Sequence, residues 1–308
     1  MDNRIAVIGS NMMDLITYMD RLPAPGETLE TDKFDLGFGG KGANQATAAA
    51  RLGANVTFVS RVGDDLFGPE VINNMKEMGI NTDHIKTSKN TSSGVAPIFV
   101  DRDGENRIFI IKGANQDLKP EDIDEAAETL KKCNLIILQL EIPLETVYYA
   151  IDFGNKNNIE VILNPAPANS LDFKMVKKVD IFVPNETELA DISNQKVNDL
   201  EDVKKAINKL QSKGLKNIIV TLGSKGAFVA TEKEQLLVES IDINPHDTTG
   251  AGDAFIGSLA YYYLQKSSLV EAVKYATIYA GLSTLKPGTQ KSYLSGDDFE
   301  NRLSNYLS

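Results

Sequence analysis

Short apolar stretches alternate along most of this chain with longer segments whose apolar residues recur every three or four positions. The short stretches predict strands at Ile5–Gly9, Val56–Val62, Leu135–Leu140, Val161–Asn164, Ile181–Pro184 and Ile218–Leu222. The longer segments predict helices at Ala43–Leu52, Phe67–Met78, Pro120–Lys132, Leu144–Asn157, Glu201–Lys213, Ala251–Gln265 and Leu269–Leu285. Strands that are apolar throughout and separated by helices indicate an α/β fold, with a mostly parallel sheet covered on both faces. Ligands of such sheets bind at the carboxyl ends of the strands.

Two segments break this alternation. Residues 12–38 hold a proline-containing turn followed by strand-like sequence, and residues 92–112 indicate a hairpin around the turn at 101–105. Together they predict a small β-sheet that projects over the strand ends as a lid. No internal repeat is present, so residues 1–308 are expected to form a single α/β domain that carries this lid.

Composition narrows the class of protein. The formal net charge of −11 argues against nucleic acid or a membrane surface as a partner. Cys133 is the only cysteine, which rules out an intrachain disulfide, and the two histidines provide no zinc cluster. No apolar stretch is long enough to span a bilayer, and no charged leader precedes an apolar segment. We therefore expect a cytoplasmic protein.

The glycine-rich segment 247–255 carries the strongest chemical signal. It places Asp247 and Asp253 around the start of a predicted helix, where backbone N–H groups without intrahelical partners attract anions. An aspartate at such a place is a poor phosphate ligand but a suitable base beside a phosphoryl group in transit. A glycine-rich turn with an aspartate helix cap is the alternative.

Three further loops contain ligand-type residues. The glycines around Lys41 and Asn44 do not match a nucleotide P-loop, but they suit a polyhydroxyl ligand. Asn185 and Glu188 lie three residues apart at a predicted helix start, which suits Mg²⁺ bound through water; a simple capped helix start is the alternative. The turn after Thr221 suits a nucleotide.

The motifs Gly39–Gln45, Asn185–Glu188 and Asp247–Asp253 together resemble those of the ribokinase-like (PfkB) carbohydrate kinases, and the resemblance extends over essentially the whole chain. It implies a three-layer α/β sandwich whose β lid pairs with the lid of a second subunit in a homodimer. It also implies a sugar and ATP as ligands, with Mg²⁺ and a monovalent cation, usually K⁺, as cofactors.

The resemblance also implies roles for individual residues. Asp253 is the expected base, and the N–H groups of Gly250, Ala251 and Gly252 form the expected anion hole. The expected sugar-binding residues are Met12, Asp14, Gly40, Lys41, Asn44, Glu141 and Asp253. Those for ATP are Asn185, Thr221, Gly223, Gly252 and Thr277, with Asn185 and Glu188 near Mg²⁺. Those for K⁺ are Asp247, Thr249, Ser283, Lys286 (through its carbonyl), Gly288 and Ser292.

The segment 9–14 departs from the family at one position that bears on the sugar. Ribokinases have the pattern Gly-Ser-x-Asn-x-Asp, and Met12 replaces the asparagine while Asp14 keeps its place. In an extended chain Met12 and Asp14 share one side, and Asn11 and Met13 point away. A thioether favours an apolar neighbour such as a C2 methylene, which predicts 2-deoxyribose as the substrate and ribose as a weaker one. The alternatives are a ribose kinase in which Met12 only packs, a kinase of another pentose or a nucleoside, and a non-catalytic sugar or nucleotide sensor.

Overall fold

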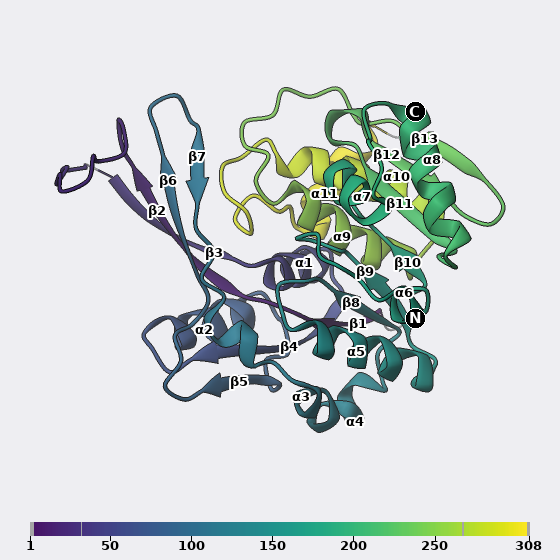
Figure 1. Cartoon of the computed structure of the whole chain (residues 1–308), viewed down its shortest axis with the longest axis horizontal. Coiled ribbons are helices and arrows are strands. Elements are labelled where there is room, and N and C mark those ends of the chain that lie inside the picture. Colours follow the sequence, from purple (N-terminus) through teal and green to yellow (C-terminus); the bar gives the residue numbers. More distant parts are fainter. Residues whose placement is uncertain (1–2, 32, 267, 307–308) are drawn as a thin grey trace.

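A central sheet of nine strands forms the middle of the molecule. The computed structural model describes residues 3–31, 33–266 and 268–306. The strand order is β13-β12-β11-β10-β9-β8-β1-β4-β5, and all neighbours pair in parallel except β12, which is antiparallel to β11 and β13 (Figure 1). The strands are β1 (Arg4–Ile8), β4 (Asn55–Gly63), β5 (Ile85–Ser88), β8 (Leu135–Leu138), β9 (Glu160–Leu163), β10 (Ile181–Phe182), β11 (Asn217–Thr221), β12 (Ala227–Ala230) and β13 (Gln235–Val238).

Helices cover both faces of this sheet, because alternate strand residues point to opposite sides. Ile5 and Val7 of β1 belong to one buried apolar cluster, and Ala6 and Ile8 belong to another. The first cluster includes residues of α1 (Lys41–Arg51), α2 (Phe67–Glu77), α9 (Ala251–Tyr263), α10 (Leu269–Ser283) and α11 (Gly296–Leu303). The second includes residues of α3 (Pro120–Glu125), α4 (Ala127–Leu130), α5 (Leu144–Asn157), α6 (Phe173–Val176), α7 (Glu186–Ser193) and α8 (Leu200–Ser212). This arrangement confirms the three-layer α/β prediction.

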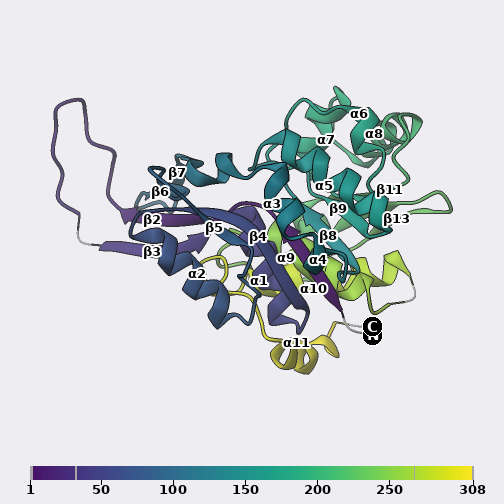
Figure 2. The ribbon, with the colours of Figure 1, turned by 90° about the horizontal axis from the view of Figure 1, so that it is seen from below.

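A separate four-stranded sheet projects from the body (Figures 1 and 2). Its order is β3-β2-β6-β7, from β2 (Met12–Tyr18), β3 (Lys33–Gly39), β6 (Val95–Val100) and β7 (Asn106–Ile108). These strands lie within the two segments that the sequence singled out, so the predicted small sheet is confirmed. We call it the lid. Several large apolar side chains of the lid and its flank are exposed, among them Phe34 (58%) and Phe109 (62%).

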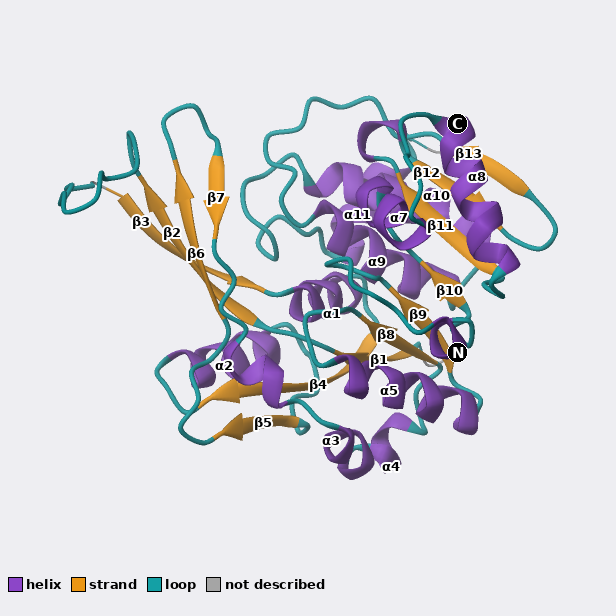
Figure 3. Ribbon diagram, viewed as in Figure 1, coloured by secondary structure: helices purple, strands orange, loops and turns teal. Residues whose placement is uncertain are grey.

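Some elements differ from the prediction. The helix expected over Pro120–Lys132 is divided at Ala126 into α3 and α4. The strand expected to reach Pro184 ends at Phe182, and proline has no N–H with which to extend the ladder. The strands β5, β12 and β13 and the helix α11 were not predicted (Figure 3). In the described part of the chain, no helix is both long and apolar enough to cross a membrane.

Candidate active site

The carboxyl ends of five neighbouring strands meet around the first turns of α1 and α9. Ser10, Gln139, Asn164 and Asn185 follow β1, β8, β9 and β10, and Thr221 ends β11. An isolated parallel bridge joins Asn185 directly to Thr221. This is the edge at which open α/β sheets bind their ligands.

A cavity of about 130 Å³ lies at the centre of this edge. Its lining includes Lys41, Asn185, Glu188, Gly252 and Asp253, which come from three of the predicted loops. The structure therefore brings together the expected base, both expected magnesium-site residues and one expected sugar-binding residue.

Asp253 lies in the first turn of α9 and is only 8% exposed. Asn44 Nδ2 donates a hydrogen bond to its Oδ2 at 2.9 Å, and Gln45 Nε2 donates one to its Oδ1 at 2.9 Å. Lys41 faces the same carboxylate: burial alone lowers the pKa of its ammonium, but Asp253, Glu141 and Glu188 outweigh burial and raise that pKa. A lysine cation thus stands beside the expected base.

The three glycine-turn residues of the expected anion hole are not equivalent. Gly250 has φ +77°, and a Cβ there would lie 2.2 Å from Thr289 Cγ2, so the fold itself requires glycine. The Ala251 N–H already donates to the Thr248 carbonyl at 3.2 Å. A Cβ on Gly252, by contrast, would meet no protein atom within 4 Å. Gly252 is therefore the glycine that leaves space for a ligand.

A second cavity of about 300 Å³ adjoins the first and shares Thr221 and Gly252 with it. Four of the five residues expected to bind ATP line it, namely Thr221, Gly223, Gly252 and Thr277. The remaining walls include apolar side chains that were not predicted from the sequence as site residues, among them Ile241, Ile243 and Phe255. The shape is that of an apolar slot with hydroxyl groups at its rim, as small-ligand sites commonly are.

Asn185 and Glu188 form a capping box at the start of α7. Asn185 Oδ1 accepts from the Glu188 N–H at 2.8 Å, and Glu188 Oε2 accepts from the Asn185 N–H at 2.9 Å. The capped helix start that the sequence left open is therefore present, and both residues still line the central cavity. Burial raises the pKa of Glu188, which its hydrogen bond from Asn185 and the charge of Lys41 only partly offset.

Glu141 connects expected sugar-binding residues to Lys41, which lines the central cavity. Its Oε2 accepts from Ser10 Oγ at 2.5 Å and from the Lys41 N–H at 2.9 Å. Asp14 shares this environment, since its burial, followed by repulsion from Glu141, raises its pKa to about 7. The sequence named Asp14, Lys41 and Glu141 as sugar-binding residues; Ser10 matches the serine of the family pattern but was not assigned a role.

The side-chain alternation inferred at residues 11–14 is present. Asn11 Nδ2 donates to Ser60 Oγ and to the Arg61 carbonyl, both at 2.8 Å. Met13 belongs to a small apolar cluster with Val62 and Val71. Met12 is 2% exposed and belongs to none of the three apolar clusters of the described residues. Asn11 is therefore committed elsewhere and does not replace the missing asparagine.

The glycines before α1 allow close packing as well as any ligand contact. Gly40 has φ +87°, and a Cβ there would lie 2.7 Å from the Asn11 backbone. A Cβ on Gly39 would lie 2.5 Å from Asp14 Oδ1. The sequence favoured a ligand contact for these glycines and left a plain glycine-rich turn as the alternative; the structure shows that they let β2 approach the loop.

Hydrogen bonds join three of the residues expected to bind K⁺, namely Asp247, Thr249 and Gly288. Asp247 accepts from the N–H groups of Thr249 at 2.9 Å and Gly288 at 2.8 Å, and although burial opposes it, these hydrogen bonds lower the pKa of Asp247. The hydroxyls of Ser283 and Ser292 donate to nearby carbonyls, which leaves oxygen lone pairs free. Lys286 is exposed. The described residues hold no cluster of three or more His, Cys, Asp or Glu side chains suited to a metal.

A set of side-chain amides around Asp253 escaped the sequence reasoning. Gln45, Gln139, Asn164 and Gln290 are buried and linked by hydrogen bonds, either to Asp253 itself or to its amide partners. One signal was available, because Gln139 and Asn164 each come directly after a strand, where parallel sheets present functional groups.

A buried carboxylate lies beside a lysine at a helix start, next to a glycine that two cavities share, and such an arrangement suits the transfer of a phosphoryl group. The model of the pfkB family of carbohydrate kinases matches residues 2–295. The chain belongs to this family, and it is an enzyme, a carbohydrate kinase.

Individual relatives narrow the comparison. Over 301 residues the chain is 53% identical to the deoxyribokinase of Salmonella typhi, covering 97% of this chain and 98% of that one. It is 36% identical to the ribokinase of Haemophilus influenzae over 292 residues, 95% of each chain. The structure of Arabidopsis thaliana ribokinase complexed with ribose and ATP superposes with a TM-score of 0.93 at 29% identity, covering 98% of this chain and 99% of that one. The fold is therefore ribokinase-like.

Proposed function

We propose that this enzyme transfers the γ-phosphoryl group of ATP to the 5-hydroxyl of 2-deoxy-D-ribose, giving 2-deoxy-D-ribose 5-phosphate and ADP, with ribose as a weaker substrate. The 53% identity to a deoxyribokinase over nearly the whole chain carries this proposal. Met12, buried on the Asp14 side of β2, agrees with it chemically. A panel of sugars with Mg–ATP, followed by location of the phosphate on the product, tests it.

In the proposed reaction Asp253 accepts the proton of the attacking hydroxyl, and the transferred phosphoryl group lies in the central cavity. The Gly252 N–H, in the first turn of α9, then points toward the charge that develops on the phosphoryl oxygens. Lys41 lies beside the same charge. The apolar slot between Thr277 and Gly223 receives the rest of the nucleotide.

The metal ions are proposed from the donor sets. When bound, Mg²⁺ would neutralise phosphate charge. Asn185 and Glu188 both line the cavity, and one oxygen of each already accepts a hydrogen bond in the capping box, so they fit Mg²⁺ through water. A K⁺ ion fits the oxygens around Asp247, Thr249, Ser283, Lys286, Gly288 and Ser292. Its proposed role is to hold the loop that precedes α9.

A methionine at position 12 predicts a measurable sugar preference. Met12→Asn should shift the ratio of kcat/KM for ribose to that for 2-deoxyribose by roughly 10- to 100-fold in favour of ribose, because an amide can bond the 2-hydroxyl and is left unpaired without it. Steady-state kinetics with both sugars measures this ratio.

The matched control is Met12→Leu, which keeps an apolar side chain and should keep the preference for 2-deoxyribose. Met13→Leu changes the residue on the opposite face and should leave the ratio unchanged as well. An unaltered ratio in Met12→Asn would show that Met12 does not read the C2 position. A wild-type enzyme that prefers ribose would favour the alternative, a ribose kinase in which Met12 only packs.

Replacing Asp14 is expected to stabilise the fold at high pH and to weaken sugar binding. The folded pKa of Asp14 is about 7 and lies above the ordinary aspartate value of 3.8, so this carboxyl contributes stability that is present below pH 4 and lost as the pH rises through 7. Asp14→Asn should therefore raise the free energy of unfolding at pH 8 by about 1–3 kcal/mol and leave it unchanged at pH 4. The same change should raise KM for the sugar at least roughly tenfold at pH 8, because an acceptor for two hydroxyls is lost.

Urea unfolding at the two pH values, together with sugar kinetics, measures both effects. An equal stability gain at both pH values would mean that the carboxyl of Asp14 is not the cause.

The proposed assembly is a homodimer through the lid, in the cytoplasm. The exposed apolar residues of the lid and its flank support the dimer, since a second lid would cover them: Phe34, Leu36, Ile108, Phe109, Ile110 and Ile111. Sedimentation equilibrium distinguishes one chain from two. The non-catalytic sensor considered from the sequence is set aside, because the chain belongs to a family of carbohydrate kinases and keeps both Asp253 and Lys41.

A further inference from the structure

The carboxylate of Asp253 is held by two buried side-chain amides, and only one of them belongs to the sugar-binding residues expected from the sequence. That one is Asn44, which donates to Oδ2. The other is Gln45, which is fully buried and donates to Oδ1 at 2.9 Å. An ionised carboxylate only accepts hydrogen bonds, so both amides must present nitrogen to it.

The direction of the Gln45 amide is set by the backbone of Val183, the residue directly after β10. The Val183 carbonyl accepts from Asn164 Nδ2 at 2.9 Å, and a carbonyl cannot donate. The opposite end of that amide, Asn164 Oδ1, therefore faces Gln45 Nε2, which donates to it at 3.2 Å. Gln139 Nε2 donates to Gln45 Oε1 at 2.7 Å from the other side. The anchored amide of Asn164 thus directs the nitrogen of Gln45 toward Asp253, and the hydrogen bond from Gln139 agrees with this direction.

We propose that Gln45 is a positioning residue for phosphoryl transfer, with Asn164 fixing its orientation; this rests on the proposed role of Asp253 as the base. The Gln45 N–H holds one carboxylate oxygen of Asp253 and fixes the plane of the carboxyl group. The remaining lone pairs of Asp253 are then aimed at the sugar hydroxyl before the sugar arrives. A base displaced by about 1 Å loses up to roughly 10²-fold in rate, so this orientation affects kcat more than binding.

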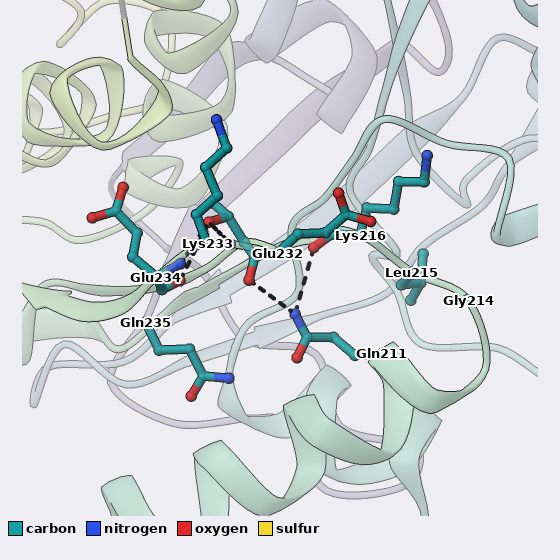
Figure 4. Close-up of a pocket in the computed structure, with 9 residues that line it drawn as sticks. Gln211, Gly214, Leu215, Lys216, Glu232, Lys233, Glu234 and Gln235 are labelled. Atoms are coloured by element: carbon teal, nitrogen blue, oxygen red, sulfur yellow. Dashed lines mark hydrogen bonds between the residues drawn. The ribbon is translucent and has the colours of Figure 1, made fainter.

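Gln45→Met tests the role with a side chain of similar volume that cannot donate. We expect kcat to fall by roughly 10- to 100-fold, with the dissociation constants of sugar and Mg–ATP within threefold of wild type. The matched control is Gln211→Met. Gln211 of α8 donates to the carbonyls of Lys216 and Thr231, each at 3.5 Å, in a different cavity at the edge of the molecule (Figure 4). This control should retain wild-type kcat.

Gln45→Glu supplies a readout that a purely structural role would not move. A carboxyl buried beside another carboxylate keeps its proton to higher pH, and while protonated it donates an O–H to Asp253. The kcat of this variant, divided by that of wild type, should be highest at acid pH and should fall as the pH rises. Lys41, Glu188 and Tyr293 also act on Asp253. They are present in both proteins, so the ratio removes most of their influence.

A ratio that does not change with pH, or a Gln45→Met variant with kcat within threefold of wild type, overturns the proposal. Should Gln45→Met fail to fold, the pH dependence of Gln45→Glu decides alone, and Gln211→Glu provides its flat control. Failure of the underlying function is distinguishable: substantial turnover by Asp253→Asn removes Asp253 as the base, whereas an inactive Asp253→Asn with a flat Gln45→Glu ratio removes only the role of Gln45.

Discussion

Asp253→Asn is expected to lower kcat by roughly 10³-fold or more, because the sugar hydroxyl then has no base to accept its proton. Sugar binding should stay within about tenfold of wild type, since the other residues around the sugar are unchanged. Single-turnover kinetics measures the chemical step, and titration calorimetry with the sugar measures binding. A kcat within tenfold of wild type would remove Asp253 from the mechanism.

The amide in Asp253→Asn is not a neutral replacement in this protein. Both groups that face position 253, Asn44 Nδ2 and Gln45 Nε2, are donors, and an asparagine brings a donor of its own. Because Gln45 is locked, Asn44 must turn over, and it then loses its hydrogen bond from Gln290. We expect a loss of about 1 kcal/mol in stability beside the loss of activity. Thermal unfolding separates the two effects.

Gly252→Ala is expected to raise KM for ATP by roughly 10- to 100-fold while leaving the fold intact, because a methyl group there costs the nucleotide about 1.5–3 kcal/mol of contact or displacement. A Cβ at this position meets no protein atom within 4 Å but lies between the two cavities. Alanine also favours the helix, so thermal stability should be equal or slightly higher. ATP kinetics and a melting curve of the same sample provide the measurement.

Gly250→Ala is the matched control two residues earlier. Its left-handed backbone and the 2.2 Å approach to Thr289 predict a loss of about 2–4 kcal/mol in the free energy of unfolding. Gly252→Ala should thus weaken ATP binding, whereas Gly250→Ala should lower the free energy of unfolding. If Gly252→Ala binds ATP normally, Gly252 does not face the nucleotide.

The sequence predicted the sheet and its helices because buried strands and amphipathic helices carry distinct apolar periods. The elements it missed are short or lie at an edge, where this signal is weak. For β12, antiparallel pairing with β11 decides its place, and no local pattern distinguishes it from a parallel strand. The division between α3 and α4 at Ala126 could not be predicted, because no proline or glycine lies there.

For the site, the structure places the motif residues Asp253, Lys41 and Glu141 close together and the residues expected to bind ATP around the second cavity; their chemical roles stay predictions. The positions of Gln139 and Asn164 directly after strands were a sequence signal, but the direction of the hydrogen bonds among the amides behind Asp253, as between Asn164 and Val183, required coordinates. The double nature of Asn185 and Glu188, at once helix cap and cavity wall, likewise required coordinates.

The hydrogen bonds at Asn44 connect residues that are far apart in the chain. Asp253 is 209 positions away from it, and Gln290 is 246 positions away. Contacts of such separation form late in folding, after large loops have closed. A ribosome releases the loops around Asp14 and Lys41 long before the segment that contains Gln290. On the proposed role of Asp253 as the base, we expect newly made chains to acquire phosphoryl transfer only once that segment has docked.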